Sequence, residues 1–307
     1  MILQTGMRTD IPAFYSEWFM NRIKEGYVLV RNPYHQELVT RYEINPNIVD
    51  LIAFCTKNPY PMLKHMKKLK KYGQYWFVTI TPYGKDLEPN VPNKNFVIKC
   101  FQQFSKIVGI NSMGWRYDPI IVNNKYSVEC HISAFEKTAS QLAGCTETCI
   151  ISFVDLYEKV KRNAPEIRNV TKNEQITIAK AFAEIGRKYD MTVKGCHESS
   201  ALADYGIDMS GCLNREVYEK SLGISLKMPK RKSQRECNCF FGTDIGAYNS
   251  CGHFCRYCYA NANVSSVKRN MARHDPMSPF LIGSQMPGDI IRQAKQYSYI
   301  DGQLSLF

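Results

Sequence analysis

Short apolar runs of strand length recur along the first two thirds of the chain. The clearest of them cover 2–6, 27–30, 49–55, 75–81, 110–115, 149–154 and 191–196. Runs with so little polar alternation are typical of strands that are buried on both faces of a parallel sheet. Residues 243–249 provide one more candidate strand much later in the chain.

Helical periodicity separates several of these runs. Two sets of apolar residues each fall on one helical face, namely Val128, Ile132, Phe135 and Leu142, and Ile178, Phe182, Ile185 and Tyr189. Thr171 and Glu174 have the spacing of a capping box and predict where the second helix begins. Alternating strands and helices indicate an α/β fold, and we expect a (βα) barrel of the TIM type.

Polar residues follow strand after strand in this pattern. They are Arg8 to Asp10, Arg31 to Pro33, Thr56 to Pro59, Thr81 and Pro82, Arg116 to Pro119, Asp155, and His197 with Glu198. Turn formation explains the prolines, asparagines and aspartates, but long cationic side chains are not turn formers. In a (βα) barrel these positions share the carboxyl-end mouth, where active sites are built. The sequence therefore predicts a polar, partly cationic mouth.

Composition limits the cellular setting. No run approaches the roughly 20 apolar residues of a membrane span, and Arg8 and Asp10 precede any apolar region of a secretory signal. We therefore expect a cytoplasmic protein with no membrane partner. The chain has 12 cysteines, and in a reducing compartment these favour metal binding or catalysis over disulfides.

The formal net charge is +12, and the excess is concentrated in three segments, 64–71, 227–235 and 267–273. The first is best explained as a solvated helix face. The other two flank a cluster of cysteines, which favours a polyanionic partner. Segment 227–235 is also the predicted boundary between a barrel body (1–230) and a cysteine-rich region (231–307).

Three cysteines of that region, Cys251, Cys255 and Cys258, have the spacing C-x3-C-x2-C, with Tyr257 just before the last. Three thiolates on one short loop can hold three irons of a cubane [4Fe–4S] cluster and leave the fourth iron open. Zinc is the alternative, but structural zinc usually takes four ligands arranged in C-x2-C pairs.

This spacing, together with CRYCYANAN (255–263), resembles the motif of the radical S-adenosylmethionine (radical SAM) superfamily, and in particular that of spore photoproduct lyase. The resemblance implies a cluster on the three cysteines, with Tyr257 beside it, whose open iron binds SAM. It also implies a 5′-deoxyadenosyl radical, a lyase or oxidoreductase reaction, and an electron donor such as flavodoxin or ferredoxin. The segments RTDIPAF, TKNP, WRYDP and DIGAYNSCGHFCRYCYAN together resemble a widespread uncharacterised microbial family along nearly the whole chain.

The position of the motif differs from that in most radical SAM enzymes, where it follows the first barrel strand. Only 49 residues follow Cys258, too few to build a barrel. We therefore interpret the chain as a circularly permuted radical SAM barrel in which the strand that leads into the cluster loop comes last.

Other cysteines suggest a second metal site. Cys237 and Cys239 form a C-x-C pair, Cys196 ends a predicted strand, and Cys212 lies between them in the sequence. Thiols at this spacing are metal ligands in many proteins, and the pattern leaves both iron–sulfur and zinc open. The remaining cysteines, Cys55, Cys100, Cys130, Cys145 and Cys149, are predicted to be small buried hydrophobes.

The predicted mouth supplies further candidate residues. We expect Arg8, Lys57, Asn58 and Arg116 to hold carboxylate or phosphate groups of SAM or substrate. We expect Asp10, Asp118 and Glu198 to bind ribose hydroxyls or to move protons. Structural ion pairs among these same side chains are the alternative.

The chain ends in QLSLF, which resembles the peptide that binds the bacterial sliding clamp, with Gln303, Leu304, Leu306 and Phe307 as its contact residues. Packing of Leu306 and Phe307 onto the barrel is the alternative. These features together favour a radical SAM-type enzyme that acts on DNA, with repair of damaged bases as one such activity. A non-catalytic iron–sulfur or zinc protein that binds nucleic acid, and a radical SAM enzyme for tRNA or a small metabolite, remain alternatives.

Overall fold

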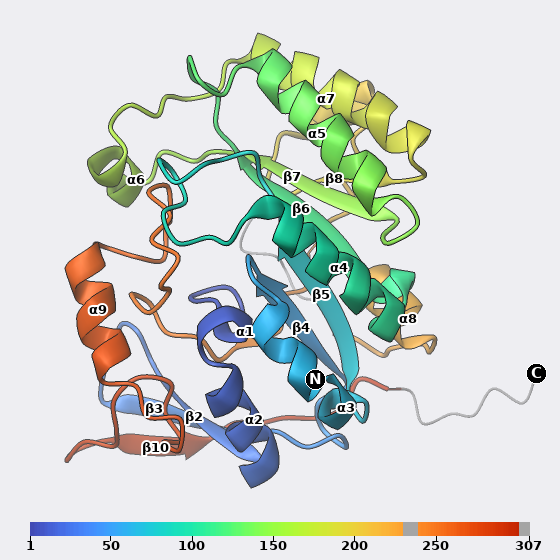
Figure 1. Ribbon diagram of the computed structural model, residues 1–307. Coiled ribbons are helices and arrows are strands. Elements are labelled where there is room, and N and C mark those ends of the chain that lie inside the picture. The colour runs from blue at the N-terminus through green and yellow to red at the C-terminus, as the bar shows by residue number, and fades with distance from the viewer. Residues whose placement is uncertain (230–238, 301–307) are drawn as a thin grey trace, which may run out of the picture.

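A computed structural model describes residues 1–229 and 239–300, and within these ranges the chain forms a large and a small sheet (Figure 1). The large sheet has the strand order β8-β7-β6-β5-β4-β1-β9, and all of its pairings are parallel. Its strands are β1 (Ile2–Gln4), β4 (Leu51–Thr56), β5 (Gly73–Thr79), β6 (Met113–Ile120), β7 (Thr148–Phe153), β8 (Thr192–Gly195) and β9 (Thr243–Asp244).

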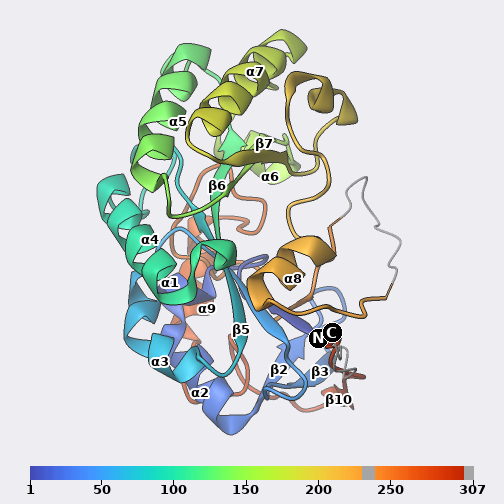
Figure 2. The same ribbon diagram turned by 90° about the vertical axis from the view of Figure 1, so that its right-hand side faces the viewer.

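Helices alternate with these strands, as the sequence pattern predicts. They are α1 (Ile11–Phe14), α2 (Ser16–Glu25), α3 (Met66–Leu69), α4 (Lys94–Val108), α5 (Val128–Leu142), α6 (Glu158–Asn163), α7 (Lys172–Lys188), α8 (Arg215–Leu222) and α9 (Val264–Ala272). Figures 1 and 2 show α4, α5 and α7 following one another around the outer side of the large sheet. The predicted capping box at Thr171 and Glu174 is present at the start of α7.

Aromatic side chains fill the layer between the large sheet and these helices. Trp76 stacks on Phe54 with ring centroids 3.8 Å apart, and Phe135 of α5 stacks on Phe182 of α7 at the same distance. Trp115 also stacks on Phe135. All five rings are fully buried, so the apolar faces predicted for the two helices do face the core, although Tyr189 caps α7 rather than extending it.

The α/β class is confirmed, but the prediction of a closed barrel is wrong. β8 and β9 are the two edges of the large sheet and do not pair with each other. β9 has only two residues, which pair with β1, and within the described residues the free side of β8 makes an isolated bridge from Lys194 to Asp208. The sheet is therefore open between its edges.

The predicted strand at 27–30 is real, but it belongs to the small sheet, whose order is β10-β3-β2. The strands of this sheet are β2 (Tyr27–Arg31), β3 (Leu38–Glu43) and β10 (Ile290–Gln293). β2 pairs antiparallel with β3 because only a short turn joins them, in which Asn32 accepts hydrogen bonds from the amides of Tyr34 and His35. Among the described residues, no helix combines the length and the apolar character needed to traverse a bilayer.

Candidate active site

A cavity of about 710 Å³ lies at the carboxyl ends of the parallel strands. Most of the predicted mouth residues line it, because parallel strands deliver the residues that follow them to the same edge of a sheet. Among the lining residues are Arg8, Asp10, Lys57, Arg116, Asp118, Asp155 and Glu198. A volume of this size is typical of small-molecule sites. Asn58 does not line the cavity, and its side-chain oxygen accepts a hydrogen bond from the amide of Tyr60 in a turn.

The loop that follows β9 brings Cys251, Cys255 and Cys258 to the same cavity. Neighbouring segments hold this loop in place, since Tyr15 donates to the carbonyl of Ser250 and Asn261 donates to the carbonyl of Cys251. Burial raises the pKa of all three thiols, that of Cys255 to about 12. Such thiols stay protonated until a metal takes the place of the proton.

The predicted iron–sulfur cluster requires three cysteines that surround a common space. No three His, Cys, Asp or Glu side chains within 1–229 and 239–300 form a ready group for one metal ion. Thiolates that hold a cubane bind separate irons, so they need to surround a common space rather than converge on a point. The three loop cysteines line one cavity, as that arrangement requires.

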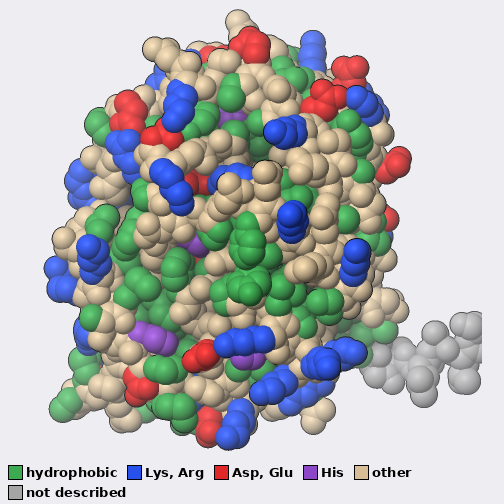
Figure 3. Space-filling model, in the orientation of Figure 1, with side chains coloured by type: hydrophobic (Ala, Val, Ile, Leu, Met, Phe, Trp, Pro, Cys, Tyr) green, Lys and Arg blue, Asp and Glu red, His purple; other side chains and the backbone are tan. Residues whose placement is uncertain are grey.

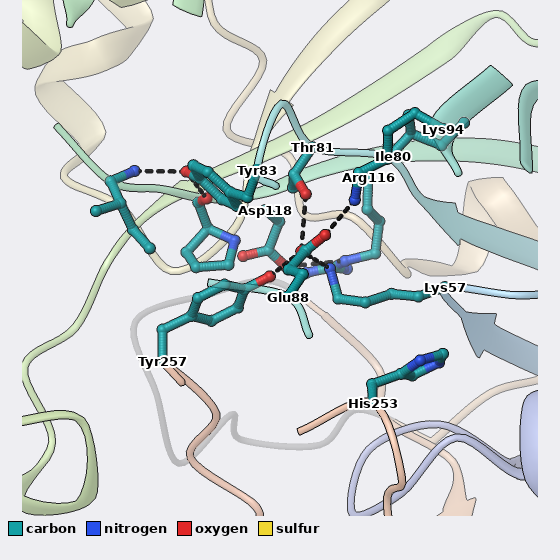
Figure 4. A network of polar contacts seen from close by, with 12 residues as sticks. Lys57, Ile80, Thr81, Tyr83, Glu88, Lys94, Arg116, Asp118, His253 and Tyr257 are labelled. Carbon is teal, nitrogen blue, oxygen red and sulfur yellow. Dashed lines mark hydrogen bonds and ion pairs between the residues drawn. The ribbon is translucent and has the colours of Figure 1, made fainter. Parts of the chain in front are cut away.

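The carboxylate of Glu88 is the centre of a buried polar network beside the loop (Figure 4). The side chain is only 1% exposed and accepts hydrogen bonds from Lys57 (2.8 Å), Thr81 (2.8 Å), Lys94 and Tyr257. Burial by itself would raise the pKa of Glu88, but the two lysines outweigh it and lower the pKa to about 2. The sequence did not single out Glu88, Thr81 or Lys94 as a network.

His253 lies inside the loop, and its imidazole pairs with the carboxylate of Asp10. Its Nε2 is 2.8 Å from the Asp10 carboxylate, which also accepts from the backbone amides of Lys57 (2.8 Å) and Ala13 (3.0 Å). Asp10 thereby caps α1 and joins it to the loop and to the end of β4. This carboxylate, predicted to bind hydroxyls or move protons, has three protein partners already.

The two arginines of the mouth also have carboxylate partners. Arg8 contacts both the carboxylate (2.5 Å) and the carbonyl (2.6 Å) of Asp244, and Arg116 pairs with Asp118, which in addition accepts from Ser152. The pair of Arg116 and Asp118 is an ion pair of the kind that the sequence left as an alternative, whereas Asp244, the partner of Arg8, was not among the candidate residues. Both pairs reduce the positive charge that the mouth offers to an anion.

Glu198 accepts a hydrogen bond from the backbone amide of Phe153 at 2.7 Å, whereas Asp10 pairs with His253 and Asp118 with Arg116. Burial is the main cause that raises the pKa of Glu198 to about 8. A carboxyl group that is largely protonated near neutral pH and lines the cavity is suited to donate a hydrogen bond or a proton.

Three cysteines of the predicted second metal site come together at the β8 side of the cavity. The Sγ of Cys212 is 3.6 Å from that of Cys196 and 3.5 Å from that of Cys239. Cys196 lines the cavity, as does Cys55, which the sequence assigned only to packing. Cys237 lies outside the described residues, and so do Gln303, Leu304, Leu306 and Phe307.

Exposed tyrosines stand at the rim of the cavity. The rings of Tyr157 and Tyr259 are 6.3 Å apart, and both residues line the cavity although they are 44% and 48% exposed. Lys159 lies over the ring of Tyr248, another lining residue, at 5.4 Å. Figure 3 shows Lys and Arg side chains distributed around apolar groups on one face of the molecule.

Comparison with known proteins places the chain in a family. The model of the family described as "Domain of unknown function (DUF1848)" matches residues 2–260, a range that includes Cys251, Cys255 and Cys258. No curated protein and no solved structure matches the chain. With most of its length matched, the chain belongs to the DUF1848 family.

Proposed function

We propose that this protein is a radical SAM-type iron–sulfur enzyme. The observation that carries the proposal is the position of Cys251, Cys255 and Cys258 on a cavity that the polar residues at the strand ends also line. Strand order supports it as well. β9, which leads into the loop, pairs with β1 at one edge of the large sheet, which is the position that the proposed permuted radical SAM sheet requires for the strand before the loop.

In this proposal the three thiolates hold a [4Fe–4S] cluster, which when reduced supplies the electron for reductive cleavage of SAM. The protein contributes position and charge. Lys57 and Lys94 favour negative charge at Cys255, and Tyr257 anchors the loop to Glu88. Glu198 is the proposed proton donor toward a ligand in the cavity, because its carboxyl group is the one held by a backbone amide rather than by a cation or histidine.

DNA is the proposed substrate, with repair of damaged bases as the proposed activity and the sliding clamp as the proposed means of delivery. Helix α9 supports this part, since it carries Lys268 and Arg269 close to the cluster loop, to which Asn270 donates at the carbonyl of Asn249. The exposed rings of Tyr157 and Tyr259 offer a surface on which a base can stack.

A non-catalytic iron–sulfur protein that binds nucleic acid is the second candidate. The ion pairs of Arg8 with Asp244 and of Arg116 with Asp118 favour it, because they occupy two of the cations expected to hold a SAM carboxylate. In that case the cluster stabilises the fold and the cavity binds no cofactor.

Anaerobic reconstitution separates the two candidates. The reconstituted protein is assayed for iron and sulfide, for the paramagnetic signal after reduction, and for 5′-deoxyadenosine after addition of SAM. The Cys251→Ser/Cys255→Ser/Cys258→Ser variant should lose the signal and the product, while Cys130→Ser on α5 should retain both. A reduced, cluster-replete protein that neither binds nor cleaves SAM refutes the enzymatic proposal and favours the second candidate.

A further inference from the structure

Two thiols that are 16 residues apart in the sequence meet at the β8 side of the cavity. Cys196 directly follows β8, and Cys212 precedes α8. Their Sγ atoms are 3.6 Å apart, and both cysteines are free thiols. Among the described residues, no three His, Cys, Asp or Glu side chains form a group that could hold a metal ion. The chemistry open to this pair is therefore that of two thiols acting together.

The two thiols differ in their access to the cavity. Cys196 is half-buried and lines the cavity, so a molecule bound there can reach its sulfur. Cys212 is only 1% exposed and does not line the cavity. In thiol–disulfide exchange one thiolate attacks the substrate and a second thiol then displaces it. The accessible Cys196 is placed for the first role and the buried Cys212 for the second.

Arg116 supplies positive charge to both sulfurs. Its guanidinium lies 3.8 Å from the Sγ of Cys196 and 3.9 Å from that of Cys212. A nearby cation favours the thiolate, which is the nucleophilic form of cysteine. Arg116 also pairs with Asp118, which holds the guanidinium in place and offsets part of its charge.

A disulfide between the two sulfurs requires them to approach from 3.6 Å to about 2.0 Å. Neither cysteine is part of a helix or strand, and Gly211, directly before Cys212, has a φ of 97°, which glycine adopts without strain. The approach therefore takes place in the segments that connect β8 and α8 rather than within these elements.

Cys239 is a third thiol in contact with the pair, since its Sγ is 3.5 Å from that of Cys212. Its sulfur also accepts a hydrogen bond from the backbone amide of Cys212 at 3.2 Å. Cys239 is buried and, unlike Cys196, does not line the cavity. A substrate in the cavity therefore meets Cys196 first, and the sulfur next to Cys196 is that of Cys212.

We infer that Cys196 and Cys212 form a redox-active dithiol that reacts with a low-molecular-weight disulfide in the cavity. The Cys196 thiolate attacks one sulfur of that disulfide, whose S–S bond breaks as a mixed disulfide forms and one thiolate leaves. The sulfur of Cys212 then loses its proton and attacks Cys196, which closes the Cys196–Cys212 bond and releases the second thiolate. The protein loses two electrons and two protons, and the two departing thiols carry them. This inference does not rest on the proposed cluster or on SAM.

The test uses the full chain, both as the reconstituted wild type and as the cluster-free Cys251→Ser/Cys255→Ser/Cys258→Ser variant. Each protein is reduced, freed of reductant anaerobically and incubated with glutathione disulfide as the probe. The remaining thiols are alkylated, and mass spectrometry of unreduced peptides locates the disulfides. We expect the Cys196–Cys212 bond as the main product in both proteins, with two glutathione molecules released for each bond formed.

Single substitutions in the cluster-free variant separate the two roles. Cys196→Ser should lower the rate of glutathione release at least tenfold, because the attacking sulfur is lost. Cys212→Ser should leave Cys196 as a lasting mixed disulfide with glutathione, because the displacing sulfur is lost. Cys145→Ser is the matched control and should change neither result, since Cys145 is half-buried and its carbonyl accepts a hydrogen bond from Ser105. Thermal unfolding shows whether each variant is folded, and Cys212→Ala replaces Cys212→Ser if the serine variant is not.

Three results would overturn the inference. The first is a Cys212–Cys239 bond as the main product, and the second is a folded protein in which Cys196 and Cys212 stay reduced. The third is a bound metal that shields both thiols from alkylation until a chelator is added, which would favour the predicted second metal site instead. A failure to cleave SAM changes none of these readouts, so this inference and the proposed function fail independently.

Discussion

Tyr257 of the cluster loop donates a hydrogen bond to the carboxylate of Glu88, 169 residues away in the sequence. The same carboxylate accepts from Lys57, Thr81 and Lys94 (Figure 4), so one buried group joins the loop to the ends of β4 and β5 and to the start of α4. The position of the loop cysteines on the cavity thus depends on a residue that binds no metal in the proposed site.

Tyr257→Phe should weaken the hold on the cluster loop without emptying the core. The ring remains in place against Tyr83, whose centroid is 5.7 Å away, but the hydrogen bond to a charged acceptor is lost, which costs about 2 kcal/mol. We expect the reconstituted variant to bind its cluster but to lose it several-fold faster in the presence of an iron chelator. Tyr72→Phe, which removes a hydrogen bond to the carbonyl of Ile44 at the amino-terminal end of β5, is the control. Equal rates in all three proteins would contradict the anchoring role.

Glu88→Gln should lower the free energy of unfolding by about 3 kcal/mol at neutral pH, because Lys57 and Lys94 then face each other without a carboxylate between them. Urea unfolding of the metal-free protein measures the change. Glu136→Gln is a matched control, since it breaks an exposed pair with Lys188 on the helical surface and should leave stability nearly unchanged.

The effect of Glu88→Gln should also depend on pH. The pKa of Glu88 is lowered to about 2 in the folded protein, so its contribution is complete above the ordinary glutamate pKa and is lost as the pH falls towards 2. The difference in unfolding free energy between the wild type and the variant should therefore shrink from pH 6 to pH 3. A difference that stays constant over this range would mean that Glu88 does not carry the charge assigned to it.

Elements that are specified by residues close together in the sequence could be predicted, whereas features that depend on distant residues could not. Near-continuous apolar runs such as 51–56 identify buried strands because burial leaves a local signal. β3 was missed because its sequence, LVTRYE, is half polar and its residues are mostly half-buried. The open edge could not be read from the sequence either, since it depends on β9 being only two residues long.

In the candidate site, too, the local sequence patterns could be predicted, but the contacts between distant residues could not. The cysteine motif and the polar residues after each strand are local patterns, and the structure brings them to one cavity. The partners of those residues are not local, since Arg8 pairs with Asp244 and Asp10 with His253 across more than 200 residues. Glu88 lies in a loop with the ordinary composition of a turn, so its role becomes visible only when the chain is folded.

The pair of Arg8 and Asp244 can be tested by a double-mutant cycle. Arg8→Gln leaves the buried Asp244 without its cation and should lower the free energy of unfolding by about 3 kcal/mol. Asp244→Asn in the same protein should recover at least 1 kcal/mol, because the uncompensated charge is removed. If Arg8 instead serves to hold a cofactor anion, the single variant will keep its stability and bind SAM more weakly, and calorimetry distinguishes these outcomes.

We propose that the C-terminal tail and helix α9 act together on clamp-bound DNA. A short peptide binds the clamp modestly by itself, but when α9 contacts the same DNA the second contact becomes intramolecular and can raise the net affinity by roughly 100-fold. Deletion of Gln303 to Phe307 should abolish clamp binding, while the iron content and the unfolding temperature stay unchanged.

Charge reversal on α9 should give the complementary result. Lys268→Glu/Arg269→Glu should leave clamp binding intact, because the tail is unaltered, but should weaken DNA binding and flatten its dependence on salt, because fewer counterions are released. Lys137→Glu/Lys188→Glu changes the same number of charges on α5 and α7 and controls for net charge alone. If deletion of the tail leaves clamp binding intact, the tail has no such role, and if both charge-reversal variants lose DNA affinity equally, α9 is not the contact surface.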